Sequence, residues 1–240
     1  MYSKSILIAM IACALLASCS VHAPWRNEPI GQEVNVAFTV KDNLLELPSV
    51  TVDGVPGRFL LGVANVRTTL DPSYLQRLPP SAMHSLELNA RQSLRFTPVA
   101  IDLHGLADGI IGADVWKGYA ITIDYRTGLL TLQREGIHPE LMTITRFAGE
   151  PEVELTIDGT STRAVLDTAS PDTIVLPQPA AAPSRRSAKI ALGGISFGEV
   201  DIRLADVARP HIGNRLLSKF LVTIDYGRKE VGLWRDPRIR

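Results

Sequence analysis

The chain has 240 residues, in which 25 Lys and Arg balance 25 Asp and Glu, so the formal net charge is zero at pH 7. A neutral chain has no long-range field to recruit nucleic acid or an anionic surface, and we expect no nucleic-acid partner. The length allows a substantial core, as one two-lobed body or two small domains.

The first 18 residues have the pattern of a targeting segment. Lys4 precedes an apolar run, Ile6 to Leu16, that is too short to span a bilayer. The sequence Leu16-Ala17-Ser18-Cys19 then resembles a bacterial lipobox, in which the Cys becomes the first mature residue and is acylated. A plain signal peptide with an incidental Cys would leave the order of these four residues unexplained. We therefore expect a membrane anchor at Cys19.

The resemblance to a lipobox also implies a location. The protein is expected in the cell envelope, facing the periplasm, and in the outer rather than the inner membrane because Ser20 follows Cys19. Residues 19–32 have two prolines and no apolar period, which is typical of a tether. The other cysteine, Cys13, lies in the segment that would be removed, so the mature chain has no cysteine pair for a disulfide.

From residue 33 onward, apolar residues alternate in short runs that Gly, Pro, Asp and Asn interrupt. This pattern predicts an antiparallel β protein with little helix. It also occurs twice. Thr51-Val-Asp-Gly54 corresponds to Thr156-Ile-Asp-Gly159 at an offset of 156 − 51 = 105, and both stretches are predicted to be strand, turn and strand.

The two copies also end alike. Gly112 to Tyr125 corresponds to Gly213 to Tyr226 at an offset of 213 − 112 = 101, and Thr-Ile-Asp-Tyr closes both segments. Between the two anchors we predict a hairpin in each copy, over Leu94 to Leu103 and over Lys189 to Leu204. The predicted units are an N-terminal one at residues 33–136 and a C-terminal one at residues 137–240, with the seam near Gly136 and Pro139.

The second copy contains the run from Val165 to Leu176, with Asp167-Thr168-Ala169 inside it, and later Ile212-Gly213. This order resembles one lobe of the aspartic peptidases, the pepsin and retropepsin clan. In the first copy, Ile110-Ile111-Gly112 corresponds to the Ile212-Gly213 motif. The resemblance covers about residues 34 to 235. It implies an all-β fold of two pseudo-twofold-related lobes, each an acid-protease β-barrel with short helices, and a cleft between them.

The resemblance makes Asp167 the candidate catalytic residue and Thr168 the residue that orients it. In that family two carboxylates face each other and share one proton, so that one activates water while the other polarises the scissile carbonyl. At the offset of 105 the corresponding residues of the first copy are Gly62 and Val63. The first lobe therefore lacks both the carboxylate and the hydroxyl, and Ala169 also replaces the glycine that is usual in the family.

Two routes to activity remain open at this point. A substitute carboxylate could come from Asp53, Asp71 or Asp108, although each is also typical of a turn, or Asp167 could pair with Asp167 of a second chain. A serine esterase is a remote alternative, because the segment from Gly194 to Gly198 matches G-x-S-x-G around Ser196. That motif needs a strand before it and a helix after it, and alternating apolar residues predict strands on both sides.

The remaining residues do not predict a cofactor or a metal. The five histidines have no ligand-like spacing, and the mature chain has no free thiol to join them. We therefore expect a monomeric, degenerate peptidase that binds a peptide or protein segment in the cleft between its lobes. An active aspartic endopeptidase is the alternative.

Overall fold

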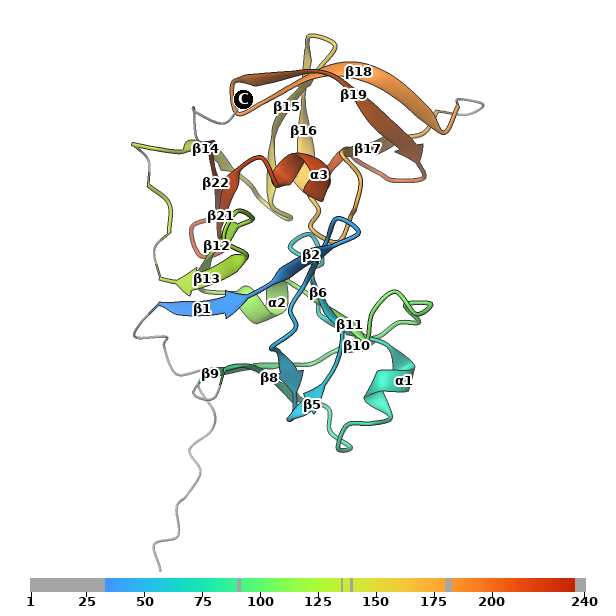
Figure 1. Ribbon diagram of the computed structural model, residues 1–240, viewed down its shortest axis with the longest axis vertical. Helices are drawn as coiled ribbons and strands as arrows, with labels where there is room; N and C mark the ends of the chain where they lie inside the picture. Colours follow the sequence, from blue (N-terminus) through green and yellow to red (C-terminus); the bar gives the residue numbers. More distant parts are fainter. Residues whose placement is uncertain (1–32, 90–91, 135, 139, 180–182, 236–240) are drawn as a thin grey trace, which may run out of the picture.

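A computed structural model describes residues 33–89, 92–134, 136–138, 140–179 and 183–235 (Figure 1). The targeting segment, Cys19 and the tether lie outside these residues. Of the helices in the described part, none is long and apolar enough to cross a membrane.

One six-stranded sheet contains strands from both halves of the sequence. Its order is β1 (Val34–Ala37), β13 (Leu129–Gln133), β12 (Ala120–Asp124), β21 (Leu221–Asp225), β22 (Glu230–Trp234) and β14 (Thr143–Arg146). The two strands that end in Thr-Ile-Asp, β12 and β21, are antiparallel partners at its centre. Thr122 pairs with Thr223, its own counterpart at the offset of 101, and their Oγ1 atoms lie 2.9 Å apart. The pseudo-twofold axis therefore passes between these two threonines.

The second half builds a closed barrel. The order around it is β15 (Glu152–Ile157), β16 (Thr160–Leu166), β20 (His211–Ile212), β17 (Ile174–Pro177), β19 (Ile195–Ala205) and β18 (Arg185–Leu192). Asp158 and Gly159 make the predicted turn between β15 and β16, both with positive φ. A short helix, α3 (Asn214–Leu217), follows β20.

The first half places the corresponding strands in two sheets. One has the order β10 (Val99–Ala100), β7 (Thr69–Leu70), β11 (Gly109–Ile111), β6 (Phe59–Leu61), β3 (Leu44–Glu46) and β2 (Thr39–Lys41). The other has the order β5 (Val55–Pro56), β4 (Thr51–Val52), β8 (His84–Asn89) and β9 (Gln92–Phe96). The helices α1 (Pro72–Leu75) and α2 (Ala113–Trp116) complete this half.

These elements confirm the predicted all-β fold of two related lobes with short helices. The hairpin expected over Lys189 to Leu204 is present as β18 and β19. The one expected over Leu94 to Leu103 is wrong, because the first half makes its hairpin earlier, with β8 and β9. Apolar residues alternate along both β8 and β9, so the pattern alone did not place the hairpin.

The two lobes share one core. Ile121 and Ile123 of β12 and Val222 and Ile224 of β21 are fully buried and belong to a single apolar cluster that extends into both halves. The lobes are therefore held together by burial of apolar surface as well as by the sheet. The exact boundary between residues 136 and 137 stays a prediction.

Candidate functional site

Two loops, one from each lobe, have the same backbone hydrogen bonds. The Asp167 N–H donates to the carbonyl of Ile212 at 2.9 Å, and the Gly62 N–H donates to the carbonyl of Ile111 at 3.0 Å. In the first lobe β6, the strand before the loop, runs parallel to β11, which Gly112 follows. In the second lobe β16 runs parallel to β20, which Gly213 follows. The backbone of the two loops is thus retained although their side chains differ.

Thr168 joins the two loops. Its fully buried Oγ1 donates to the carbonyl of Leu61 at 2.6 Å and accepts from the N–H of Val63 at 3.1 Å. Val63, the counterpart of Thr168, is equally buried but has no hydroxyl to return the bond. This threonine bond between the loops therefore comes from the second lobe and is not returned by the first.

The carboxylate of Asp167 has a histidine as its neighbour. Its Oδ1 accepts from the N–H of Ala169 at 3.1 Å, and its Oδ2 lies 3.1 Å from His211 Nδ1. The side chains of Asp167 and His211 are 20% and 25% exposed. Sequence reasoning missed His211, although a signal was present, because at the offset of 101 it corresponds to Ile110 and directly precedes the Ile212-Gly213 motif.

The equivalent place in the first lobe is filled by the side chains of Ile110 and Asn65. A Cβ on Gly62 would overlap Cγ2 of Ile110 and would lie 2.5 Å from Oδ1 of Asn65. Ile110 belongs to a small buried cluster with Leu60 and Ala107, and Ala169 of the second lobe packs against it. There is consequently no room at Gly62 for an aspartate in the present packing.

The two tyrosines of the repeated segments, Tyr125 and Tyr226, each donate a hydrogen bond to a residue of the other half of the chain. Tyr125 donates to Oδ1 of Asn214 at 2.8 Å, and the Asn214 amide donates in turn to the carbonyl of Thr168 at 2.7 Å. Tyr226 instead donates directly to the carbonyl of Val63 at 3.2 Å. Withdrawal from water raises the pKa of both phenols above its usual range. The repeated Thr-Ile-Asp-Tyr therefore serves contacts across the axis.

The three proposed substitute carboxylates are bound within the first lobe. Asp53 lies 2.6 Å from His84 Nδ1, and Asp108 accepts from the N–H of Arg58 at 2.7 Å. Asp71 caps α1, where its bonds to the Ser73 hydroxyl and to backbone N–H groups lower the pKa of the carboxyl. Each has a local structural role, and the group that the structure places beside Asp167 is His211.

Ser196 does not have the surroundings of a serine nucleophile. It is an exposed residue of β19, and a turn at Gly193 and Gly194 joins this strand to β18. The elbow needs a helix after the serine, so the esterase interpretation is wrong at this position. In the described part of the chain, no group of three or more His, Cys, Asp or Glu side chains is placed to hold a metal ion.

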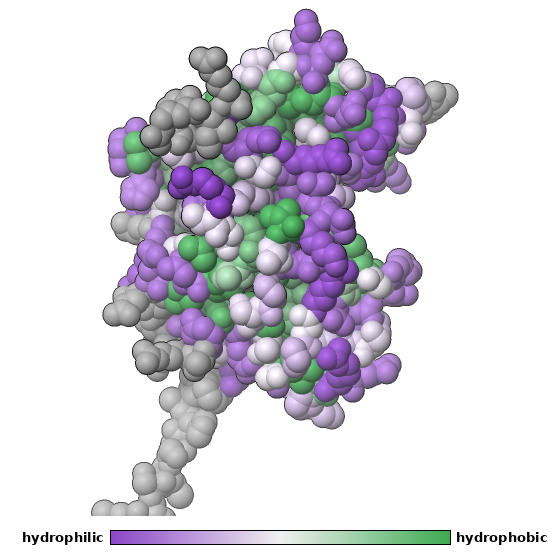
Figure 2. All heavy atoms as spheres, in the orientation of Figure 1, coloured by the Kyte–Doolittle hydropathy of each residue, from purple (hydrophilic) through white to green (hydrophobic). Residues whose placement is uncertain are grey.

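The molecule is hollowed between the two lobes. Figure 2 shows the indentation in its outline, on the side away from the six-stranded sheet. Hydrophilic residues flank it in this view. The hollow has the place that the resemblance predicts for a cleft.

Comparison with known proteins agrees with this architecture. No family model and no curated protein matches the sequence. Among solved structures, the crystal structure of the aspartic proteinase from Irpex lacteus is similar with a TM-score of 0.57 and 10% sequence identity, covering 86% of this chain and 98% of that one. The chain therefore has an aspartic-peptidase-like fold, and at this identity the likeness shows the fold alone.

Proposed function

We propose that the protein is a degenerate aspartic-peptidase-like protein that binds a peptide or protein segment between its lobes without cleaving it. The observation that carries this proposal is the filled place at Gly62, where Ile110 and Asn65 occupy the space of the second carboxylate. The usual mechanism needs two carboxylates with pKa values driven apart by their proximity, and a single one does not provide both the acid and the base.

The features that shape a cleft are retained. The buried Thr168 bond to Leu61 and the Tyr125 bond to Asn214 join the lobes, and each loop keeps its backbone bond within its own lobe. Such contacts fix the relative position of the two walls, whether or not hydrolysis occurs. The contacts that hold the two walls do not involve the missing carboxylate, so a cleft does not depend on it.

Asp167 then has a role in recognition. A partly exposed carboxylate with lone pairs beyond its bonds to Ala169 and His211 accepts hydrogen bonds from main-chain N–H groups or from a cationic side chain. Leu103 and Ala169, which are partly buried and pack against the cluster of Ile110, offer a place for an apolar side chain of the same segment. The expected ligand therefore combines a donor with an apolar neighbour.

The pair of Asp167 and His211 also favours a second candidate function. An aspartate that orients a histidine leaves the other ring nitrogen to act as a general base on water. Residual hydrolysis by this route would need no second carboxylate. Pairing of Asp167 with a second chain is less favoured, because it requires separation of β12 from β21 and of their shared core.

One assay separates the two functions. The purified protein is incubated with a peptide mixture from acid to neutral pH, and both cleavage and binding are measured beside Asp167→Asn and His211→Gln. We expect binding without cleavage, with the affinity reduced roughly tenfold in Asp167→Asn because a charge-assisted hydrogen bond is lost. Asp201→Asn, on the exposed surface of β19, is the matched control. Cleavage that disappears in both site variants would establish the hydrolase instead.

We also propose that Cys19 carries a lipid that anchors the protein in the bacterial envelope. The support is the lipobox-like order of Leu16 to Cys19. Acylation by several chains would hold the protein stably at a membrane. Mass spectrometry of the mature N-terminus tests this, and Cys19→Ala should release the protein from the membrane fraction.

A further inference from the structure

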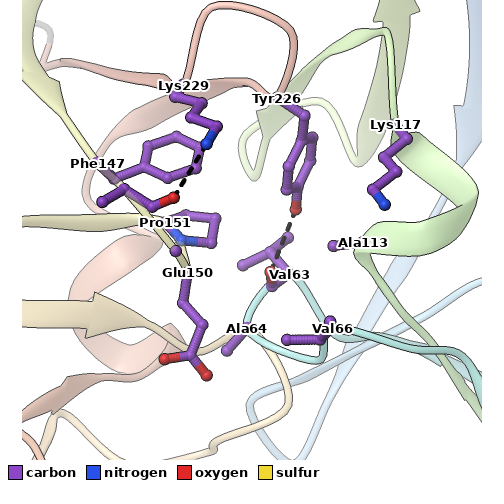
Figure 3. A pocket seen from close by; sticks show the side chains of 12 residues that line it. Val63, Ala64, Val66, Ala113, Lys117, Phe147, Glu150, Pro151, Tyr226 and Lys229 are labelled. Atoms are coloured by element: carbon purple, nitrogen blue, oxygen red, sulfur yellow. Dashed lines mark hydrogen bonds between the residues drawn. The ribbon is translucent and has the colours of Figure 1, made fainter.

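A second hollow lies beside the residues that follow Gly62, where segments of both halves of the chain meet. It has a volume of about 210 Å³, and its lining includes neither Asp167 nor His211. Figure 3 shows Val63, Phe147 and Pro151 around it, with Tyr226 between them and α2. We call this hollow the Val63 pocket.

The same place in the second lobe is filled by the chain itself. The counterpart of Ala113 in the pocket wall is Asn214, at 113 + 101 = 214. The Asn214 amide donates to the carbonyl of Thr168 at 2.7 Å and to that of Asn43 at 2.6 Å. Asn43 lies in the turn between β2 and β3, so a main-chain carbonyl at the tip of a hairpin occupies this niche.

The niche beside Val63 has no such cover, because the segment of the second half that runs past it is shorter. Phe38 and Phe147 are counterparts, each packed edge-on against one of the repeated tyrosines, with centroid distances of 5.9 and 6.3 Å. From Phe38 to Thr51 the chain advances by 51 − 38 = 13 residues, but from Phe147 to Thr156 by only 156 − 147 = 9. The difference of four residues falls in the segment that forms the β2–β3 hairpin in the first half, and the niche beside Val63 stays open.

Two cationic residues belong to the open niche alone. At the offset of 101, Lys117 and Lys229 correspond to the neutral residues Ser218 and Gly128. The ammonium group of Lys229 donates to the carbonyl of Ala148 at 3.2 Å and has two further N–H groups to donate.

The other charges around the pocket are accounted for. Among the interactions of the described residues, Lys117 has no ion pair and no side-chain hydrogen bond. Glu150, the acidic residue of the lining, is paired with Arg209. Figure 3 shows the two lysines on either side of Tyr226 and the Glu150 carboxylate at the opposite end of the pocket. The unmatched charge is therefore positive.

We propose that the Val63 pocket binds a carboxylate carried on a small apolar group. Val63, Phe147 and Pro151 receive the apolar part, while Lys117 and Lys229 bind the carboxylate. The C-terminal residue of a peptide and a free N-acylated amino acid share this chemistry. The hairpin carbonyl in the second lobe supports it, because it shows that a peptide group fits the equivalent niche. This site is independent of the function proposed for the cleft.

To test the proposal, the purified protein is titrated with small probes, and binding is measured by calorimetry and by NMR chemical shifts. The probes are N-acetyl-leucine, N-acetyl-leucinamide, and a leucine-terminated tetrapeptide as free acid and as amide. We expect each acid to bind at least about tenfold more tightly than its amide, because the amide lacks the charge that the lysines bind. A tetrapeptide acid stronger than N-acetyl-leucine would identify a peptide C-terminus as the ligand, and equal affinities would identify a small free carboxylate.

Variants locate the binding. Ala113→Asn should abolish it by filling the pocket as Asn214 fills its counterpart, and Lys117→Gln and Lys229→Gln should each weaken it several-fold. Lys219→Gln, an exposed lysine outside the pocket, is the matched control. The proposal is overturned if acids and amides bind equally, if no acid binds at millimolar concentration, or if binding of N-acetyl-leucine survives in Ala113→Asn.

Discussion

The two loops at the pseudo-twofold axis have the same backbone hydrogen bonds but different side chains. In the second lobe the loop presents Asp167 with His211 beside it, and Thr168 reaches across to Leu61. In the first lobe Gly62 presents no side chain, and Ile110 fills the space. The difference shows that the loop itself depends on backbone hydrogen bonds, while the side chains at its tip are free to change together.

The largest expected effect comes from returning a carboxylate to the first loop. Gly62→Asp should lower the free energy of unfolding by roughly 3 kcal/mol or more, because its Cβ overlaps Ile110 and its charge would be buried beside apolar groups. Urea unfolding measures the loss.

The double variant Gly62→Asp/Ile110→Ala is the control for this prediction. It should recover part of the lost stability, because the smaller alanine removes the overlap at Ile110. A Gly62→Asp protein as stable as the parent would show that the first loop still has room for the second carboxylate.

Breaking the contact between the loops should have the next largest effect. Thr168→Val keeps the shape but leaves the buried carbonyl of Leu61 and the N–H of Val63 without their partner, at a cost of about 2 to 3 kcal/mol. Thr223→Val, which removes only the bond to Thr122 at the centre of the sheet, should cost about 1 kcal/mol. Equal losses in the two variants would contradict the special role of Thr168.

Replacing the two repeated tyrosines should lower the stability by unequal amounts, with the larger loss at Tyr125. Tyr125→Phe deprives the Oδ1 atom of buried Asn214 of its donor, and we expect a loss of about 1 to 2 kcal/mol. Tyr226→Phe removes a longer bond beside an open pocket, with an expected loss of about 0.5 to 1 kcal/mol. Thermal unfolding of both variants measures the difference, and the reverse order would contradict it.

Alkaline pH should reveal the buried phenols, with no effect at neutral pH. Burial raises the pKa of Tyr74 to about 12, and those of Tyr125 and Tyr226 are also raised. Since the unfolded phenols lose their protons near pH 10 and the folded ones only at higher pH, stability is complete below pH 10 and is lost as the pH rises through the folded pKa. The urea midpoint from pH 9 to 12 measures this, and a smaller slope is expected in Tyr125→Phe.

The repeat made much of the fold predictable. Equivalent turns at Asp53-Gly54 and Asp158-Gly159 and the identical Thr-Ile-Asp-Tyr segments indicated two related β lobes, because turn chemistry and alternation are local properties. The hairpin of the first lobe was placed too late in the chain, since the same alternation runs along β8 and β9 and does not mark where the chain reverses. Local patterns also did not predict which residues far apart in the sequence contact each other.

The sequence by itself determined that Asp167 has no aspartate as its counterpart, because the offset of 105 places Gly62 there. Only the tertiary structure decided what takes the place of the missing pair. The parallel pairing of β16 with β20 brings His211 to Asp167, and that of β6 with β11 brings Ile110 over Gly62. These contacts join residues more than forty positions apart, so they follow from strand register and close packing, which a local pattern does not contain.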